Sequence, residues 1–278
     1  MSQARELAEN ASQLFSLPDI YFQLCAILKD DSSDLNDVVQ LIEMDAALTA
    51  RLLRVANSAF YQFPAEIKSI SRAVNLIGTR ELSNLVLATC VASAFKHVPE
   101  SVIDMDHFWG NNMDVALIAL NLGQQIEYSE PDVLFVSGLL HNLGELVVLQ
   151  DCPEQAHQAL LLEGNELPWE RQLSVLGFTF ADCSAELLDI WQLPTDIVET
   201  VRYQHNPDQA VANPLAAALL HLACRTDWWL DEGSEEPKSI CAEALARTEL
   251  NSDNLKSAAE FARFEALTFV GAISGSLY

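Results

Sequence analysis

The chain has 278 residues, half of them hydrophobic, and 15 basic against 40 acidic residues give it a net charge of −25. This length accommodates one large or two modest domains with a sizeable core. The acidity argues against nucleic acid as the main ligand and against anionic membrane surfaces, because binding to both depends on Lys and Arg.

The cysteines and the hydropathy pattern indicate a cytoplasmic protein. No two cysteines form a C-x-x-C pair, so reduced thiols are expected. The first 15 residues lack the uninterrupted apolar segment of a signal peptide, and no run approaches the ~20 apolar residues that a membrane helix needs. The longest candidate, 133–149, is interrupted by Ser137, His141, Asn142 and Glu145. The six cysteines are Cys25, Cys90, Cys152, Cys183, Cys224 and Cys241.

Apolar residues at helical spacing predict helices through the first hundred residues. Asp34 and Asp45 each stand directly before such a stretch, where their side chains can cap the first turn. Ser69 can cap a short helix that ends at Gly78, because glycine suits the left-handed conformation that follows a helix. Thr79 then begins the next helix.

Two helices on either side of Gly78 could also form a helix-turn-helix that reads DNA. The second of them, RELSNLVLATCVASAF, carries a single basic residue, Arg80, at its start. A recognition helix needs several polar and basic side chains that point outward. We therefore expect an ordinary helical hairpin here.

The helical pattern lapses near Pro99, which we take as the junction between two packed helical subdomains, residues 1–98 and 99–278. No convincing alternating strand is present, so the expected fold class is all-α. The segment 231–237 is expected to be a solvated acidic loop. Further helices are expected at 108–126, 131–149, 153–163, 168–176, 180–191, 194–205, 213–230 and 254–270.

Residues 45–87, which begin DAALTARLLRVANSAFYQF, resemble the opening half of the HDOD domain, the HD-related output domain of bacterial signalling proteins. The match includes the segment from Asn57 to Tyr61, and then Ser69 and Gly78. The second half aligns at 108–109, GLLHNLGEL (138–146), LGF (176–178) and RYQHNP (202–207). The resemblance covers roughly residues 14–207, with weaker similarity through 221–225, and it implies an HD-like helical core in the second subdomain.

Catalytic members of the wider HD superfamily hold one or two divalent metals with histidines and aspartates from several helices, and the metals polarise a phosphate ester and activate water. The resemblance places the corresponding positions of this chain at Asn111, His141, Asn142, Phe180, His205 and Cys224. Gln204 also stands where a histidine is common. Only His141 and His205 keep a good ligand atom, because an amide has no charge to offset the loss of a metal's water shell and Phe180 has no lone pair.

These departures imply a degenerate site that holds no metal or other cofactor. The alternative is a metal-dependent phosphohydrolase or phosphodiesterase that keeps a weak metal at His141 and His205. Cys224 together with these two histidines could instead form a tetrahedral zinc site or support Cys-His chemistry. A buried free cysteine is the more common situation for such a residue.

The stretch LFVSGLLHNLGEL (134–146) is expected to be a buried helix in which Gly138 lets another helix approach closely. A neutral His141, hydrogen-bonded to Asn142, Asn112 or a carbonyl, would satisfy a polar core without a metal. The polar cleft left by the metal could still bind a small molecule, including a nucleotide.

Two surfaces are candidates for a protein partner. Asn57, Ser58, Phe60 and Tyr61 form an aromatic corner after a helix, which would otherwise be a packed corner. The second candidate is the pair Trp228 and Trp229, of which one ring could instead be buried. We expect a non-catalytic HDOD-type signalling or regulatory protein that acts through contacts with an unidentified partner of a signalling pathway.

Overall fold

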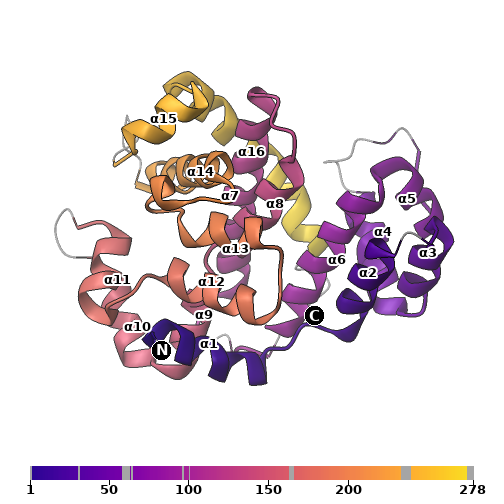
Figure 1. Ribbon diagram of the computed structural model, residues 1–278, viewed down its shortest axis with the longest axis horizontal. Helices are drawn as coiled ribbons and strands as arrows, with labels where there is room; N and C mark the ends of the chain where they lie inside the picture. The colour runs from indigo at the N-terminus through magenta and orange to yellow at the C-terminus, as the bar shows by residue number, and fades with distance from the viewer. Residues whose placement is uncertain are drawn as a thin grey trace. The chain divides into compact units, whose positions relative to one another are not determined.

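A computed structural model describes residues 2–30, 32–57, 63, 65–95, 97–99, 101–162, 166–232 and 239–273. These residues form helices and contain no strand, so the chain is all-α (Figure 1). They divide into two units. The larger comprises residues 1–15 and 98–263, and the smaller comprises residues 16–97 and 264–278.

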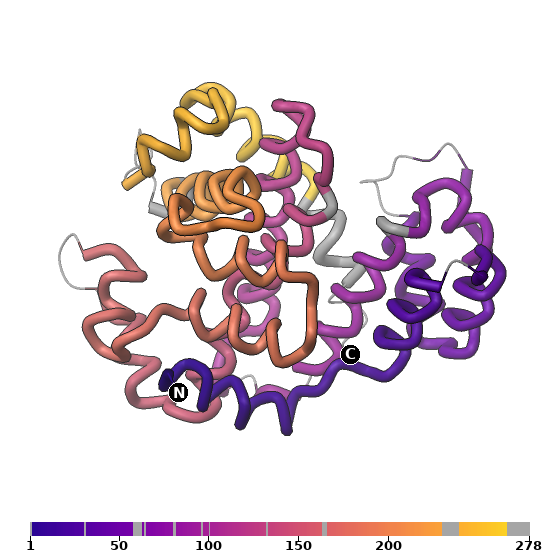
Figure 2. Tube along the Cα trace, in the orientation of Figure 1, coloured from indigo at the N-terminus to yellow at the C-terminus, as the bar shows by residue number. Residues whose placement is uncertain are grey.

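The first helix, α1 (Gln3–Leu14), belongs to the larger unit, whereas the expected boundary at residue 98 assigned it to the N-terminal subdomain. It lies beside α9 (Leu143–Asp151) and α12 (Phe180–Ile190), far along the chain (Figure 2). Its apolar face of Ala4, Leu7, Ala8 and Ala11 is buried. Burial of this face explains why α1 joins a distant part of the sequence.

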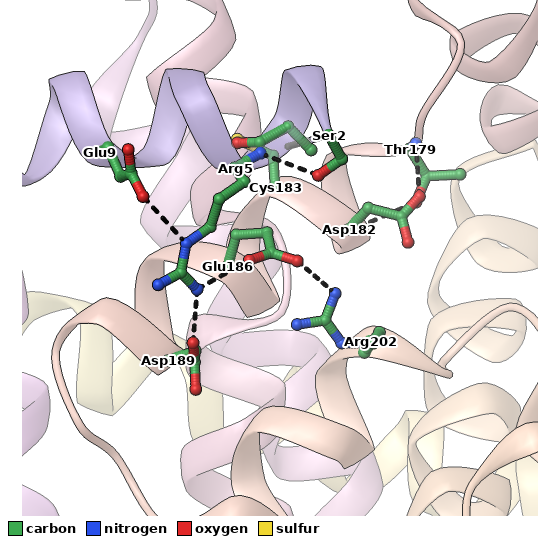
Figure 3. Close-up of polar contacts among 10 residues, drawn as sticks. Ser2, Arg5, Glu9, Thr179, Asp182, Cys183, Glu186, Asp189 and Arg202 are labelled. Carbon is green, nitrogen blue, oxygen red and sulfur yellow. Dashed lines mark hydrogen bonds and ion pairs between the residues drawn. The ribbon is translucent and has the colours of Figure 1, made fainter.

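An ion-pair network also holds α1 in place (Figure 3). Arg5 donates to two acids of α12, Glu186 at 2.9 Å and Asp189. It also donates to Glu9, one turn along its own helix, at 3.3 Å. The same Glu186 accepts from Arg202 of α13 (Thr195–Arg202) at 2.8 Å. One carboxylate therefore links three helices of the larger unit.

The smaller unit contains the helices expected from the first hundred residues. The capping side chains are confirmed: Asp34, Asp45 and Ser69 each accept hydrogen bonds from backbone N–H groups of the first turn that follows. Gly78 has φ 93°, which favours glycine. The helices are α2 (Asp19–Lys29), α3 (Leu35–Glu43), α4 (Ala46–Ala56), α5 (Ile70–Ile77) and α6 (Thr79–Ala94).

The helix after Gly78 is a core helix of this unit. Side chains from Leu82 to Ala92 on α6 are largely buried, and α6 contacts α2, α4 and α5. A helix that enters a DNA groove must present its side chains to solvent. The burial therefore favours the ordinary hairpin over the DNA-reading alternative.

The core of the larger unit is built on α7 (Met105–Gln125), which packs against α8 (Pro131–Leu140) and α14 (Pro214–Glu232) (Figure 1). The expected close approach at Gly138 occurs here, because a Cβ on this glycine would lie 2.4 Å from Ala116 Cα of α7. The remaining helices of this unit are α10 (Pro153–Leu160), α11 (Pro168–Leu176), the 3-10 turn Pro207–Gln209, α15 (Ala242–Thr248) and the part of α16 (Ser252–Ile273) up to residue 263.

The expected single helix over 131–149 is wrong, because the chain turns at His141 and Asn142 between α8 and α9. The His141 Nδ1 donates to the Gly138 carbonyl at 2.6 Å. That carbonyl would otherwise accept the N–H of residue 142 in a continuing helix. The competing side-chain bond accounts for the break and directs both polar residues away from a regular helix face.

One helical stretch of the described residues, 133–151, is long and apolar enough to cross a membrane by length and composition alone. Within the fold 78% of the most apolar part of that stretch is buried. It spans the α8–α9 break and packs among α7, α12 and α13, as a core segment does.

Candidate functional site

A cavity of about 260 Å³ lies within the larger unit, between the α8–α9 turn and the helices around it. The structure brings all six expected positions to its wall, although they come from distant parts of the sequence. The lining includes Asn111, His141, Asn142, Phe180, His205 and Cys224.

His141 is neutral in this cavity and has one free lone pair. Its Nδ1 must carry the proton, because it faces the Gly138 carbonyl at 2.6 Å and a carbonyl only accepts. Its Nε2 therefore keeps the lone pair. Burial lowers the pKa of His141 to about 4, which leaves the ring uncharged at neutral pH. Of the three partners expected for a neutral His141, the structure has the carbonyl.

Asn142, at the position of the superfamily's aspartate, is engaged with the neighbouring acid. Its amide Nδ2 donates to the carboxylate of Glu145 on the first turn of α9. Burial raises the pKa of Glu145 to about 7, so this group is partly protonated at neutral pH. The only acid one turn beyond His141 therefore carries less negative charge than an ordinary glutamate.

Gln204 links the floor of the cavity to the α8–α9 turn. Its amide nitrogen donates to the carbonyls of His141 at 3.0 Å and Val201 at 3.1 Å. Its amide oxygen accepts from the Cys224 thiol at 3.1 Å. Burial raises the pKa of Cys224 to about 12, so the sulfur is a protonated donor and not a thiolate ligand. An imidazole at position 204 could not make all three bonds.

Two further residues line the other side of the cavity, Arg225 and Trp169, and the sequence motifs did not single them out. Arg225 has only 2% of its surface exposed, and its guanidinium lies over the Trp169 ring, 3.2 Å from the ring centroid. It donates to His205 Nδ1 at 3.3 Å and to the Ser239 carbonyl at 3.1 Å. His205 itself stacks on Trp169, with centroids 5.0 Å apart. The signal in the sequence was an arginine at the end of the apolar stretch PLAAALLHLACR (214–225), because a charged residue in a buried helix indicates a functional contact.

Arg225 also determines what His205 can do. A guanidinium has no lone pair, so His205 Nδ1 accepts and its Nε2 carries the proton. Burial, and then the charge of Arg225, lower the pKa of His205 well below its usual value. His205 therefore has no lone pair left for a metal in this arrangement.

The donor set of the cavity does not fit an HD-type metal centre. It offers one imidazole lone pair, amide oxygens, a protonated thiol, a partly protonated acid and the carboxylate of Asp227, on a wall that also carries the buried cation of Arg225. A metal site needs at least three His, Cys, Asp or Glu donors close together. In the described part of the chain, three such donors lie within 4.8 Å of one another at Asp208, Cys241 and Glu243, and this group does not line the cavity. The zinc alternative meets the same obstacle, since His141, His205 and Cys224 do not form such a group among these residues.

The two expected partner surfaces have different outcomes. Trp229 has 6% of its surface exposed and is part of the core, which agrees with the alternative in which one ring of the pair is buried and leaves only Trp228 as a surface candidate. Trp228 is half-buried, lines the cavity and meets Trp169 edge to face, with centroids 5.9 Å apart. On a helix, consecutive side chains point about 100° apart, which is why one ring is inside and the other at the cavity.

The corner at Asn57 is described only at its first residue. Asn57 ends α4, and its side chain bonds to the backbone of Ile67 through both N–H and carbonyl, at 2.7 and 2.8 Å. These bonds close the loop locally, as a packed corner requires. Ser58, Phe60 and Tyr61 lie outside the described residues.

Comparison with known proteins supports the resemblance to the HDOD domain that was seen in the sequence. The HDOD domain model matches residues 14–207. A Treponema pallidum (strain Nichols) protein named only as uncharacterized is 28% identical over 214 residues, which are 73% of this chain and 40% of that protein. The chain thus spans less than half the length of this relative.

Solved structures share the fold over nearly the whole chain. A Shewanella amazonensis SB2B protein named "Putative phosphohydrolase" has a TM-score of 0.76 at 26% identity and covers 100% of this chain and 99% of its own. An HDOD domain protein of unknown function from Geobacter sulfurreducens has a TM-score of 0.72 at 22% identity, covering 98% and 97%. With the family match over more than half of its length, the chain belongs to the HDOD domain family.

Proposed function

We propose that this HDOD protein is a signalling component that has lost the HD metal site and acts without catalysis, through contact with a protein partner. Family membership supports the signalling role. A structure of the same fold from Marinobacter aquaeolei VT8 is named "Putative signal transduction protein". Its TM-score is 0.75 at 21% identity, and the match covers 98% of this chain and 66% of that one. All six cysteines are free thiols, which suits a cytoplasmic location.

The observation that carries the proposal is the buried guanidinium of Arg225 at a cavity where a metal hydrolase needs anionic ligands. As an illustration, charges of +2 and +1 at a separation of about 5 Å repel by about 7 kcal/mol at an effective dielectric constant of about 20. The two acids that line the cavity, Glu145 and Asp227, form no cluster of metal donors with a third His, Cys, Asp or Glu in the described part of the chain. A divalent cation therefore gains little here and loses its hydration.

The loss of the metal site is tested by elemental analysis. The purified full chain is incubated with Mn²⁺, Fe²⁺ or Zn²⁺, dialysed and measured, and its turnover of bis(4-nitrophenyl) phosphate is followed in parallel. We expect clearly less than one metal per chain and no turnover. Stoichiometric metal with turnover that His141→Ala abolishes would overturn the proposal.

The partner role is tested separately by affinity capture. Phe60→Ser combined with Tyr61→Ser alters the corner, and Phe22→Ser, a partly exposed aromatic elsewhere, is the matched control. We expect a captured protein to be lost with the corner variant and kept with the control. Equal capture by both variants would remove the corner as the contact surface.

A metal-dependent phosphohydrolase remains the second candidate, and the similarity to the Shewanella amazonensis structure favours it. That function requires the His205 ring to turn its lone pair away from Arg225 and into the cavity. Under this alternative, Arg225→Ala should increase metal content and turnover. Under the non-catalytic proposal it should leave turnover absent.

A further inference from the structure

Arg225 is a buried cation whose hydrogen bonds reach no carboxylate in the described part of the chain, although the charge of Glu170 acts on it at longer range. Its two hydrogen bonds go to a neutral imidazole and to a backbone carbonyl. Burial lowers its pKa to about 10, so it remains charged at neutral pH. Burial of a charge is unfavourable unless the charge is paired, and guanidinium groups pair best with the two oxygens of a carboxylate or phosphate.

The guanidinium opens onto space large enough for a ligand. Arg225 lines the 260 Å³ cavity and also, together with Trp169 and His205, a second cavity of about 430 Å³. The acids on the wall of the first cavity are Glu145, whose carboxylate accepts a hydrogen bond from Asn142, and Asp227. An anion can therefore reach Arg225 without first displacing a bound carboxylate.

The rest of the wall suits a planar apolar group. Trp169 covers one face of the guanidinium, and the ring of Trp228 meets the ring of Trp169 edge to face. Phe180 and Leu160 add apolar surface, while the amides of Asn111 and Asn142 supply polar atoms. Ligand sites commonly combine mostly apolar walls with a few placed polar groups and one charge.

We propose that this cavity binds a small organic anion in which a phosphate or carboxylate group is attached to a planar ring, with the anion paired to Arg225 and the ring against Trp228. The inference rests on the proposed function in one respect: the space is not taken by a metal. It assigns a task to Arg225 and Trp169, which the loss of catalysis alone does not explain. Such a ligand would supply the input to which a non-catalytic signalling protein responds.

The test is isothermal titration calorimetry of the full chain, prepared without metal, with adenosine monophosphate, benzoate, inorganic phosphate and adenosine as probes. We expect saturable binding of adenosine monophosphate or benzoate, weaker binding of phosphate, and none of neutral adenosine. The first pair distinguishes a phosphate from a carboxylate ligand. Binding should also raise the unfolding temperature, since the ligand binds only the folded state.

Variants separate the anion contact from general effects on folding. Arg225→Met should weaken anion binding by about tenfold or more. Arg225→Lys keeps the charge without the two-pronged geometry and should give an intermediate value. Arg72→Met, the same change at an exposed position of the smaller unit, should leave binding unchanged. Trp228→Leu should reduce the affinity for the ring-bearing anion to that for phosphate.

Two results would overturn the inference: none of the three anions binds saturably, or Arg225→Met and Arg225→Lys bind the ring-bearing anion as tightly as the native chain. Either result would mean that Arg225 only fills the cavity, and the proposed loss of catalysis would stand. Anion binding that appears only after Mn²⁺ is added would instead contradict both proposals.

Discussion

His141 and Gly138 are joined by a side-chain hydrogen bond that ends α8, with the ring Nδ1 2.6 Å from the carbonyl oxygen. The bond stops the helix at the point where the chain enters the cavity. It also sets the tautomer of the ring and the position of Asn142. One local contact therefore shapes both the core and the candidate site.

Loss of this bond should destabilise the fold. His141→Ala leaves a buried carbonyl without its side-chain donor and removes a packed ring, so we expect the free energy of unfolding to fall by about 2 kcal/mol. Urea unfolding followed by circular dichroism measures it. His157→Ala, at an exposed position of α10, is the control and should change stability by less than about 0.5 kcal/mol. Equal effects would show that the Gly138 contact contributes nothing specific.

The close packing of α7 and α8 predicts that an added methyl group destabilises the chain at one glycine and slightly stabilises it at another. A Cβ at Gly138 would lie 2.4 Å from the backbone of Ala116, so Gly138→Ala should cost about 3 kcal/mol or prevent folding. Gly110 lies in α7 with no atom within 4 Å of its added Cβ. Gly110→Ala should therefore stabilise the chain by about 0.5 kcal/mol, because alanine favours helix. Thermal unfolding of the two variants compares them directly, and a tolerated Gly138→Ala would contradict the close approach.

Glu145 should make stability depend on pH. Its pKa rises from 4.5 to about 7 on folding because burial disfavours the charged form. The folded protein thus holds this proton more tightly than the unfolded chain. The associated stability is fully present below about pH 4.5 and is lost as the pH rises through about 7.

Glu145→Gln keeps an acceptor for Asn142 and carries no charge. It should raise stability by roughly 3 kcal/mol at pH 8 relative to the native chain, with a much smaller difference at pH 4.5. Urea unfolding at a series of pH values measures this difference. Glu154→Gln, at an exposed position of α10, is the control and should show no such trend. A difference that is constant with pH would mean that Glu145 does not titrate in this range.

The ion pairs of Arg5 predict a local effect on α1. Arg5→Ala removes its contacts with Glu186 and Asp189. Because these groups are partly exposed, we expect a loss of only about 1 kcal/mol, which should shrink in 1 M NaCl. Hydrogen exchange of residues 3–14 should accelerate more than that of the remaining helices. Lys68→Ala, which removes an exposed pair with Glu66, is the control. Unchanged exchange in α1 would mean that its apolar face alone holds it.

Much of the local structure follows from the chain's own pattern. The capping roles of Asp34, Asp45 and Ser69 and the close approach at Gly138 were predicted correctly, because each depends on residues within a turn or on the absence of one side chain. The positions that line the cavity could be chosen by resemblance. Their motifs stand at recognisable spacings along the helices.

The remaining features depend on contacts between residues far apart in the sequence. The placement of α1 on α12, the pairing of Arg225 with Trp169 and His205, and the burial of Trp229 follow from which helix faces meet, and periodicity alone does not specify that. The break at His141 was missed because a side-chain bond to a carbonyl competed with helix propagation. Amino-acid pattern therefore established the helices and the candidate positions, whereas long-range packing decided their neighbours and, through burial, their charges.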